Sequence, residues 1–484
     1  MHSVVSPREK GVVIRVKRYI LTLSGLPRAK VNDLLLGSDN SFAIVRAIEG
    51  ESVMALLLSG NAHLGDEYTL AGEYPLYSAD EYLFGRVIDT LGRTVDGKGA
   101  VSSPNIPLAL EVEAPGIEVR LPIHDQLSTG VSAVDTLVPI AKGQRQLLFG
   151  PMRSGKTTFL TQTVLEQAYG GTVCIYTVIG KPINGLKKIT DSLLNTQDSL
   201  PIITIAALSD EPPPLVWLAP SVTYLLAEAF QKQGKDVLVI LDDLDAHAKY
   251  LREIALLEER LPSTESYPGD IFYQHAHLME RSGHFNKDHG GGSITSLPVI
   301  QTDVNNFSDL IPTNVMACTD GHLSFSEQLR AQGQYPSVLV SESVTRVGRQ
   351  SQCTMQKQIT LRVQKLLSEY STQKEYETFS SDLSQQAHKI LHDGSILEEL
   401  MLQEPYEPYE LSVQVIIFAL LFVGFFEKEN RQSVKKKKSA FVEKLHSDSR
   451  FDGVRKKVFD DNMTWEEFTE FLALQIPVLK KVYE

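Results

Sequence analysis

The octapeptide at residues 150–157 constrains the fold of this chain more than any other feature. It fits the phosphate-binding P-loop pattern and reads Gly150-Pro151-Met152-Arg153-Ser154-Gly155-Lys156-Thr157. An apolar segment precedes it at residues 146–149, and a helix-like segment starts at Thr158. This order of strand, loop and helix predicts an α/β core in which backbone N–H groups and the positive end of a helix dipole face an anion.

A nucleoside triphosphate is the natural ligand of such a loop. We expect Lys156 to reach the β- and γ-phosphates as a point charge and the Thr157 hydroxyl to ligate Mg²⁺ beside them. Residues 150–158 are therefore predicted to bind ATP with Mg²⁺. The alternative is a chance glycine turn, which the strand-loop-helix context disfavours.

The size and charge of the chain limit the classes of protein to which it can belong. At 484 residues it is long enough for several domains, and its formal net charge of −13 argues against a nucleic-acid partner. Its cysteines are odd in number and lack CxxC spacing, which indicates reduced thiols in a cytoplasmic setting; they are Cys174, Cys318 and Cys353. No apolar run reaches the ~18 residues of a spanning helix, so membrane association is expected only through partners.

Hydrophobic patterning predicts three domains. Residues 1–76 carry short alternating strands typical of a β-barrel. Residues 77–352 alternate apolar strands with helix-length segments, which predicts a mostly parallel sheet covered by helices. The strands expected there are 146–149, 173–179, 202–207, 237–241 and 315–319. Residues 353–484 show helical periodicity, so the predicted fold is an α/β P-loop nucleotide-binding core with an N-terminal β-barrel and a C-terminal helical domain.

Local patterns in the last third predict smaller features. Thr464 and Glu467 have the spacing of a helix capping box. The apolar run at residues 415–426 is too short to span a membrane and is expected to be a buried helix. The lysine run at residues 435–438 is expected to be a solvated, charged loop.

The strand at residues 237–241 leads into Asp242 and Asp243. A carboxylate at the carboxyl edge of a parallel sheet can hold Mg²⁺ through water, so Asp242 is the predicted magnesium residue and Asp243 a local cap. Acidic strand ends are also common without any metal. Four histidines, His275, His277, His284 and His289, raise the question of another metal site, but no acidic or cysteine ligand is suitably spaced, which favours surface or packed histidines.

Two basic residues bear on catalysis. Lys181 follows the strand after the P-loop helix, where a water-activating base would project, and an ammonium group cannot accept a proton. The pocket is therefore expected to hold nucleotide without efficient turnover, although Lys181 could equally be an ordinary solvated lysine. Arg346 lies on a glycine-terminated loop, and a guanidinium suits the charge of a transferring phosphoryl group, even in a neighbouring subunit's site. An isolated loop arginine can also be purely structural.

Taken together, these segments resemble the α subunit of F-type ATP synthases along nearly the whole chain. The loop Ser343-Val344-Thr345-Arg346-Val347-Gly348 is similar to the family's Ser-Val-Ser-Arg-Val-Gly loop. The other motifs that carry the resemblance lie at residues 89–93, 96–99, 114–117, 128–140, 267–270, 290–293, 297–300 and 311–315.

The resemblance implies a hexameric ring in which α alternates with catalytic β subunits around a central γ stalk. It also implies peripheral stalk subunits, a membrane ion-translocating sector, and a location on the cytoplasmic face of a membrane, most simply the bacterial inner membrane. Arg346 would be the arginine finger that reaches the neighbouring β subunit's γ-phosphate, with Ser343 in the same interface loop. Lys181 falls where α subunits carry glutamine and catalytic β subunits carry glutamate.

The chain departs from the family pattern in three places. Its P-loop replaces the usual Gly-Asp-Arg-Gln-Thr-Gly-Lys-Thr but keeps Gly150, Gly155, Lys156 and Thr157, so phosphate binding is expected to persist. Gln403 matches one of two glutamines near the adenine, whereas Pro405 replaces the second. The sequence begins almost at the first barrel strand, so stalk attachment is expected to differ, as in a divergent second-copy synthase.

The expected function is that of a regulatory, non-catalytic subunit of a rotary ATP synthase. The chain would bind MgATP, supply Arg346 to a β subunit, and help couple ATP synthesis or hydrolysis to ion transport, with negligible turnover by itself. One alternative is a self-sufficient ring ATPase of the secretion or export type, which would require a glutamate near Lys181. Another is a structural spacer with an empty pocket.

Overall fold

The structure is a computed structural model that describes residues 9–71, 79–101, 113–194, 200–261, 266–302, 309–377 and 384–483. Two compact units divide the chain: Met1–Pro122 with Ala168–Thr319, and Ile123–Gln167 with Asp320–Glu484. The predicted domain boundary between residues 76 and 77 lies outside the described residues.

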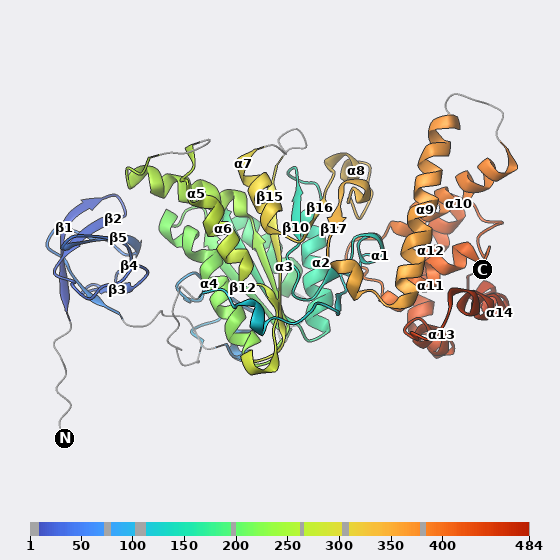
Figure 1. The fold of residues 1–484 in the computed structure, drawn as a ribbon, viewed down its shortest axis with the longest axis horizontal. Helices are drawn as coiled ribbons and strands as arrows, with labels where there is room; N and C mark the ends of the chain where they lie inside the picture. Colours follow the sequence, from blue (N-terminus) through green and yellow to red (C-terminus); the bar gives the residue numbers. More distant parts are fainter. Residues whose placement is uncertain are drawn as a thin grey trace, which may run out of the picture. The chain divides into compact units, whose positions relative to one another are not determined.

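The first unit begins with a closed, antiparallel six-stranded barrel, drawn in blue in Figure 1. Its strands are β1 (Lys10–Lys17), β2 (Ile20–Ser24), β3 (Leu34–Gly37), β4 (Phe42–Glu49), β5 (Ser52–Ser59) and β6 (Glu67–Leu70). They follow one another around the barrel in the order β1-β2-β5-β4-β3-β6. Alternate side chains such as Leu21, Leu23 and Ala55 fill the interior, which confirms the predicted barrel.

The same unit holds five parallel strands with the order β15-β13-β11-β12-β7. They are β7 (Arg86–Asp89), β11 (Val173–Lys181), β12 (Ile202–Leu208), β13 (Val237–Asp242) and β15 (Ser293–Gln301), with the short β14 (Gly283–His284) antiparallel to β15. The helices of this unit are α3 (Ile183–Leu194), α4 (Pro213–Gln231), α5 (Leu244–Leu257), α6 (Ile271–Glu280) and α7 (Leu310–Cys318). Helices α4 and α5 pack directly on the strands, as expected for strands whose residues are buried on both faces.

The prediction of a strand at residues 315–319 is wrong, because α7 covers most of that segment. Pro312 lies in the first turn of this helix, where a backbone N–H has no intrahelical partner and its loss is tolerated. Ile311 and Val315, one helical turn apart, are both buried. Short apolar runs do not distinguish a strand from a buried helix.

The second unit carries the P-loop between β10 (Leu147–Gly150) and α2 (Lys156–Tyr169). Strand β16 (Gly321–Ser324) runs parallel to β10, and β17 (Val344–Thr345) is antiparallel to β16. Other short elements before residue 354 include β8 (Gln126–Leu127), α1 (Ser132–Leu137), β9 (Ile140–Ala141) and α8 (Glu327–Ala331).

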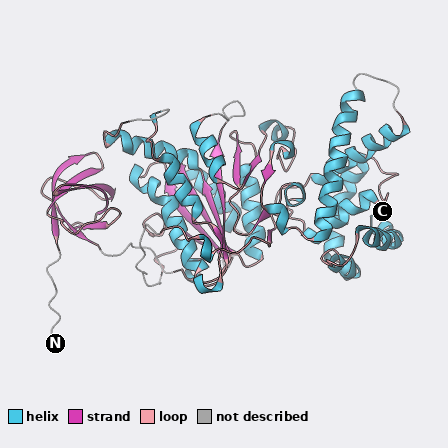
Figure 2. Ribbon diagram, in the orientation of Figure 1, coloured by secondary structure: helices cyan, strands magenta, loops and turns pink. Residues whose placement is uncertain are grey.

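From residue 354 onward the described chain is helical, as predicted and as Figure 2 shows. The helices are α9 (Thr354–Glu377), α10 (Gln385–Met401), α11 (Leu411–Phe422), α12 (Arg431–Ser447), α13 (Asp452–Lys457) and α14 (Trp465–Tyr483). Helix α11 is buried along most of its length, as expected for its apolar run. The capping box is confirmed at α14, since Thr464 N donates to Glu467 Oε2 at 2.8 Å and Glu467 N to Thr464 Oγ1 at 3.2 Å.

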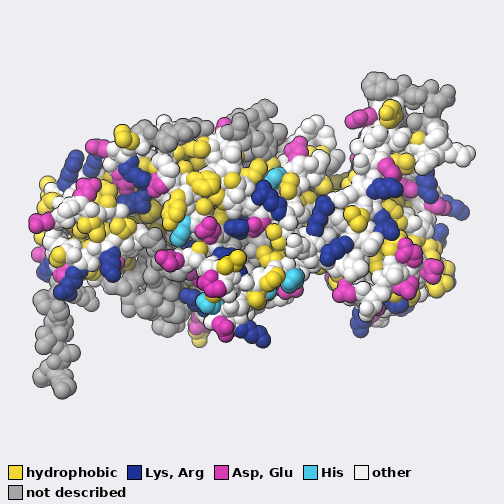
Figure 3. Space-filling model, viewed as in Figure 1, with side chains coloured by type: hydrophobic (Ala, Val, Ile, Leu, Met, Phe, Trp, Pro, Cys, Tyr) yellow, Lys and Arg dark blue, Asp and Glu magenta, His cyan; other side chains and the backbone are white. Residues whose placement is uncertain are grey.

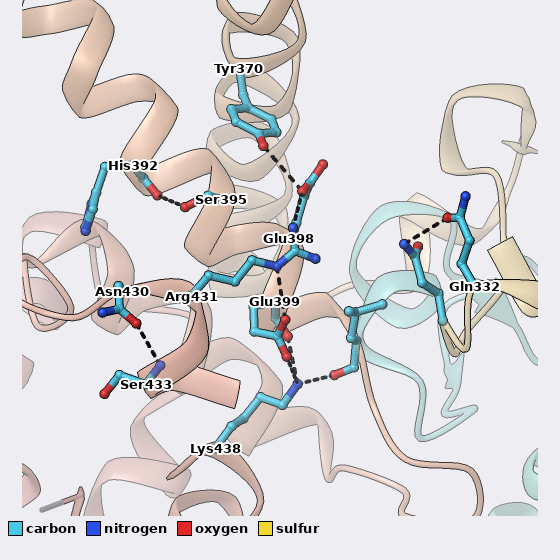
Figure 4. Close-up of polar contacts among 12 residues, drawn as sticks. Gln332, Tyr370, His392, Ser395, Glu398, Glu399, Asn430, Arg431, Ser433 and Lys438 are labelled. Atoms are coloured by element: carbon cyan, nitrogen blue, oxygen red, sulfur yellow. Dashed lines mark hydrogen bonds and ion pairs between the residues drawn. The ribbon is translucent and has the colours of Figure 1, made fainter. Parts of the chain in front are cut away.

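The lysine run at residues 435–438 is not a loop, which corrects the prediction made from its charge. It lies within α12, and Lys438 falls on the buried stripe that includes Val434, Phe441 and Val442. The Lys438 ammonium donates to the backbone oxygens of Glu399, 2.7 Å away, and Leu402, 2.6 Å away, at the end of α10 (Figure 4). Burial lowers the Lys438 pKa to about 8.

Arg431 binds the same end of α10 (Figure 4). Its Nη1 lies 3.0 Å from Glu398 Oε2 and its Nε lies 3.2 Å from Glu399 Oε2. Cations at the carboxyl end of a helix stabilise the unpaired carbonyls and the negative end of its dipole. These two side chains therefore fix the point where α10 stops and the segment containing Gln403 begins.

Lys, Arg, Asp and Glu side chains are interspersed over the face of the molecule shown in Figure 3. This distribution is compatible with the moderate net charge of −13. In the part of the chain that the structure describes, every helix is either too short or too polar to cross a bilayer.

A buried carboxylate organises the second unit. Asp135, in α1, is fully buried, and its oxygens accept hydrogen bonds from Thr129 N, Thr129 Oγ1, Gly130 N and Gln414 Nε2 at 2.7–3.1 Å. Burial raises the Asp135 pKa to about 6 against the opposing effect of these donors. Since all four groups donate, they favour the carboxylate form, which predominates at neutral pH. The Asp135 side chain thus connects the segment before the P-loop to α11.

We expect Asp135→Asn to destabilise the protein, because an amide NH₂ in place of either oxygen would face at least one N–H group that can only donate. A loss of about 2 kcal/mol or more is the expected scale for hydrogen bonds to a buried charge. Differential scanning calorimetry should show a lower Tm by about 4 °C or more, the corresponding shift for a unit of roughly this size. The matched control is Asp125→Asn at an exposed position, and an equal Tm for both variants would contradict the role of Asp135.

Candidate functional site

The P-loop has the backbone geometry that anion binding requires. Gly150 and Gly155 have φ angles of 147° and 96°, and Arg153 has a φ of 61°. These angles curl the chain between β10 and α2. At Gly150 a Cβ atom would lie 2.5 Å from Phe325 O, and at Gly155 it would lie 2.5 Å from Ser337 Oγ. A side chain at Gly150 would therefore displace the backbone at Phe325, and one at Gly155 would displace the Ser337 hydroxyl.

Hydrogen bonds from neighbouring segments hold the loop, in addition to its own φ angles. Phe325 N donates to Phe149 O at 2.9 Å, and Ser337 Oγ donates to Ser154 O. Ser154 itself is buried, whereas Met152 and Arg153 are exposed. The backbone of the loop is therefore pre-organised, and two of the four residues that depart from the family pattern, Met152 and Arg153, are exposed to solvent.

Lys156 occupies the first position of α2 and is buried. Its ammonium donates to Gly150 O at 2.6 Å, to Pro151 O at 2.7 Å and to Ser154 Oγ at 3.3 Å. The charge is thus held inside the curl, beside the amino end of a fourteen-residue helix. Helix dipole and ammonium act in the same direction, so both favour a polyphosphate.

Thr157 and Thr158 follow on the first turn of α2. Thr157 is exposed and Thr158 is partly buried. An exposed threonine hydroxyl directly after the P-loop lysine is suited to ligate a divalent cation that also binds phosphate oxygens. The loop residues therefore fit a nucleotide, and Thr157 fits the metal that accompanies one.

Gln403 lies in the segment that follows α10 and contacts residues 130–132. Its Nε2 donates to Gly130 O at 2.9 Å and to Glu407 O at 3.1 Å, and its Oε1 accepts from Ser132 N at 2.6 Å. The side-chain amide is buried and bonded to three backbone groups. Its contact with adenine stays a prediction, while the structure shows that Gln403 ties its segment to residues 130–132.

Sequence reasoning missed a second link between this segment and α2. Gln162 Oε1 accepts hydrogen bonds from Tyr335 Oη at 2.9 Å and from Tyr406 N at 3.0 Å. The Tyr406 hydroxyl lies 3.3 Å from Thr161 Oγ1, and the residue remains 46% exposed. An exposed tyrosine with a positive φ of 66° beside the P-loop helix is a candidate surface for a nucleotide base. Only its aromatic type could have drawn attention to it in the sequence.

Asp242 and Lys181 lie together in the first unit. They end the neighbouring parallel strands β13 and β11, in which Asp242 is opposite Val178. Lys181 Nζ is 2.5 Å from Asp242 Oδ2, and the Tyr176 hydroxyl donates to the same oxygen at 2.7 Å. The Asp242 side chain is 4% exposed and that of Lys181 is 25% exposed. Lys181 is therefore not a free loop lysine, and its paired ammonium cannot serve as the base that activates water.

The role of Asp242 as a magnesium residue stays a prediction. A divalent cation binds carboxylates directly or through water that the carboxylate accepts from. One Asp242 oxygen already accepts from the Lys181 ammonium and from the Tyr176 hydroxyl, so a cation or its water would use the other oxygen or displace Lys181.

The neighbouring acidic and histidine residues have local roles. Asp243 caps α5 by accepting from Ala246 N at 2.7 Å, as predicted, and burial together with Asp242 raises its pKa to about 6. Among the four histidines considered for a metal, only His275 is buried, and its Nε2 lies 3.4 Å from His247 Nδ1. Burial lowers the pKa of His275 to about 3 and that of His247 to about 4.

Arg346 extends from a loop whose backbone is anchored at several points. Arg346 N donates to Asp320 O at 3.0 Å, and Thr345 Oγ1 donates to Pro139 O at 3.0 Å. Ser343 Oγ donates to Leu339 O at 2.7 Å and accepts from Ser324 N at 3.0 Å. The Ser343 hydroxyl therefore holds the loop against β16.

The Arg346 side chain itself is exposed. Within the described residues, its guanidinium makes no ion pair and no hydrogen bond. By contrast, the nearby Arg145 guanidinium is paired with Asp320 at 2.6 Å. A fixed loop that presents one unpaired guanidinium to solvent can serve an anion outside this chain.

The predicted residues fall into three groups. The P-loop and Gln403 lie in the second unit, and the bonds of Gln162 and Tyr406 connect their segments. Arg346 belongs to the same unit on its own loop. Lys181 and Asp242 form a separate pair in the first unit.

Comparisons with known proteins agree with these features. Residues 130–345 match the ATP synthase alpha/beta family, nucleotide-binding domain, and residues 352–473 match the ATP synthase alpha/beta chain, C terminal domain. The chain is 32% identical to "ATP synthase subunit alpha" of Clostridium botulinum (strain Eklund 17B / Type B), across 98% of this chain and 94% of that protein.

Two further relatives carry copy numbers in their names. "ATP synthase subunit alpha 1" of Mycoplasmopsis pulmonis (strain UAB CTIP) is 34% identical across 91% of this chain and 84% of its own length. "ATP synthase subunit alpha 2" of Polaromonas naphthalenivorans (strain CJ2) is 35% identical across 87% of this chain and 82% of its own length. With its barrel, its P-loop core and its helical domain, the chain belongs to the ATP synthase alpha/beta family and is similar to its alpha subunits.

Proposed function

We propose that this chain is the regulatory, non-catalytic nucleotide-binding subunit in the catalytic head of a rotary ATP synthase or ATPase. It binds ATP at residues 150–158 and lends the Arg346 guanidinium to a neighbouring catalytic β subunit. In the complex, ATP synthesis or hydrolysis on the β subunits is coupled to ion transport.

The observation that carries the proposal is the anchored Arg346 loop. An arginine finger must be unpaired within its own subunit and held in a fixed position, so that little entropy is lost when it meets the transition state. Arg346 meets both conditions among the described residues, since its loop is tied to Asp320, Pro139 and Ser324 while its guanidinium is exposed.

Lys181 supports the non-catalytic part of the proposal. Turnover of ATP requires a group that orients or deprotonates water beside the γ-phosphate. At this strand end the chain offers an ammonium already bound to Asp242, which can neither accept a proton nor orient water as a carboxylate does.

The partners follow from the family and are proposed with it. They are β subunits that alternate with this chain in a hexamer, a central γ stalk, and peripheral stalk subunits. The membrane ion-translocating sector is reached only through these subunits. The complex would lie on the cytoplasmic face of the membrane.

Replacing the finger tests the proposal directly. In the complex with β subunits, Arg346→Ala should lower the rate of ATP hydrolysis by about 10³-fold or more, because charge on the transferring phosphoryl group loses its external donor. The rate is measured by phosphate release under saturating ATP. Native mass spectrometry should show the same subunit composition as for the unsubstituted complex.

Arg349→Ala is the matched control, since Arg349 is an exposed arginine three residues along the chain. It should leave hydrolysis within about twofold of the unsubstituted complex, because a solvated surface arginine contributes little. Equal losses in the two variants would reject a specific role for Arg346.

Nucleotide binding is tested through the P-loop lysine. Lys156→Ala should weaken binding of a fluorescent ATP analogue to the full-length chain by about tenfold or more, because the phosphates lose a buried, charge-assisted donor. Lys357→Ala, at an exposed position on α9, is the control. If neither variant changed the nucleotide content of the assembled ring, the structural-spacer alternative would gain support.

Turnover by the chain alone separates the proposal from a self-sufficient export-type ATPase. The purified chain should bind ATP but hydrolyse it at no more than the background rate, because its own strand end lacks the water-activating carboxylate. A coupled-enzyme assay over a range of protein concentrations measures this rate. Hydrolysis that rises steeply with concentration would indicate an active homo-oligomer instead.

A further inference from the structure

The proposed function places the nucleotide at residues 150–158 but assigns no residue to its base. We propose that the base stacks on the Tyr406 ring and is not selected by hydrogen bonds, so that the site accepts ATP and GTP alike. The ligand class is then the purine nucleoside triphosphates. This inference rests on the proposed function, in which the phosphates lie in the P-loop.

Tyr406 lies on the side of α2 that also carries the residues predicted to bind phosphate and metal. Its hydroxyl is 3.3 Å from Thr161 Oγ1, which donates to the backbone oxygens of Thr157 and Thr158. Thr161 follows Thr157 by four residues, which is about 6 Å along a helix. Residues four apart lie on one face, so the phenol lies one turn beyond Thr157. The base of a nucleotide whose phosphates occupy the loop can therefore reach this ring.

A continuous group of contacts connects Tyr406 to the P-loop. Gln162 Oε1 accepts from Tyr406 N at 3.0 Å and from Tyr335 Oη at 2.9 Å. Burial and the nearby Tyr406 phenol raise the pKa of Tyr335, and the charge of Arg330 opposes that rise. The Arg330 Cδ lies 3.7 Å from the position that a Cβ would take at Gly155. All these residues belong to the second unit, so the contacts lie within one compact body.

The segment that carries Tyr406 is held at both ends. At one end, Lys438 Nζ donates to Leu402 O at 2.6 Å. At the other end, Tyr409 N donates to Gly130 O at 2.9 Å. The ring is therefore placed before a ligand arrives, and little conformational entropy is lost when a base stacks on it.

The amide of Gln403, which was predicted to contact the base, is occupied by the protein itself. Its Nε2 donates to Gly130 O and Glu407 O, and its Oε1 accepts from Ser132 N. The residue is 5% exposed, so a bond to a ligand would be made at the expense of buried hydrogen bonds. Gln403 therefore positions the segment and does not select the base.

The other residues near Tyr406 in the sequence offer little selection between bases. Pro405 has no polar side-chain group. Glu404 and Glu407 are exposed, so water competes for their carboxylates. An aromatic ring can contact every base through its π-face, and such stacking tolerates a change of base. Adenine and guanine share the purine ring, so we expect them to stack about equally well.

The first test compares ATP with GTP on the full-length chain by isothermal titration calorimetry in excess Mg²⁺. Their Kd values should agree within about fivefold, because stacking supplies most of the contact with the base. A larger preference for either nucleotide would show that hydrogen bonds select the base. That result would overturn the inference and leave nucleotide binding intact. Absence of binding for both nucleotides would instead reject the proposed function, and the inference with it.

Removing the ring tests Tyr406 itself. Tyr406→Ala should weaken the binding of ATP and of GTP by about tenfold each, the scale on which base–aromatic stacking contributes. Inorganic tripolyphosphate has no base, so its affinity should be the same for Tyr406→Ala and for the unsubstituted chain. Equal weakening of all three ligands would indicate a purely structural residue and would overturn the inference, as would unchanged binding of both nucleotides.

Two further variants serve as controls. Tyr406→Phe keeps the ring and should bind both nucleotides within about threefold of the unsubstituted chain, whereas a loss equal to that of Tyr406→Ala would reject stacking. Tyr376→Ala removes an exposed tyrosine from α9 and should leave all three affinities unchanged. The comparison of ATP with GTP on the unsubstituted chain decides the inference even where Tyr406→Ala does not fold.

Discussion

The carboxylate of Asp135 is the interaction on which the nucleotide-binding half of the chain depends. It gathers Thr129, Gly130 and Gln414 around one buried charge. The backbone oxygen of the same residue accepts from Gln126 and Gln352. Segments far apart in the sequence thus converge on one point, from which the chain continues through β9 and β10 into the P-loop. A buried charge with several donors is costly to disrupt, so it fixes these segments in one arrangement.

The second buried carboxylate, Asp242, differs from Asp135 in being paired with a cation. Around Asp242 the chain supplies its own cation and its own phenol, which is the environment of a structural carboxylate. In the proposed function the P-loop holds the phosphates, whereas the end of β11 offers the Lys181 ammonium, paired with Asp242, in place of a water-activating group. On this proposal binding and turnover depend on separate residues, and a chain can retain one while it loses the other.

Much of this organisation was readable from the sequence because it follows local rules. Glycines at 150 and 155, apolar strands and the Thr464 capping box each depend on a few consecutive residues, and the structure confirms these elements. The errors came from residues whose environment is decided at a distance. From its sequence context Lys438 is expected to be solvated, but α10 packs against it. Val315 lies in an apolar run that is compatible with a strand or a helix. The partner of Lys181 is on another strand. No residue spacing in the sequence predicts the hydrogen bond from Tyr176 to Asp242.

The anchoring of the Arg346 loop has a consequence for timing in the proposed complex. The hydroxyls of Ser343 and Thr345 leave the backbone of this loop little freedom, so only the arginine side chain can adjust. A guanidinium on such a fixed loop cannot approach its target through a local rearrangement of the loop. Its distance from a neighbouring γ-phosphate would change only when whole subunits shift, so rotation of the stalk would control when Arg346 reaches that phosphate.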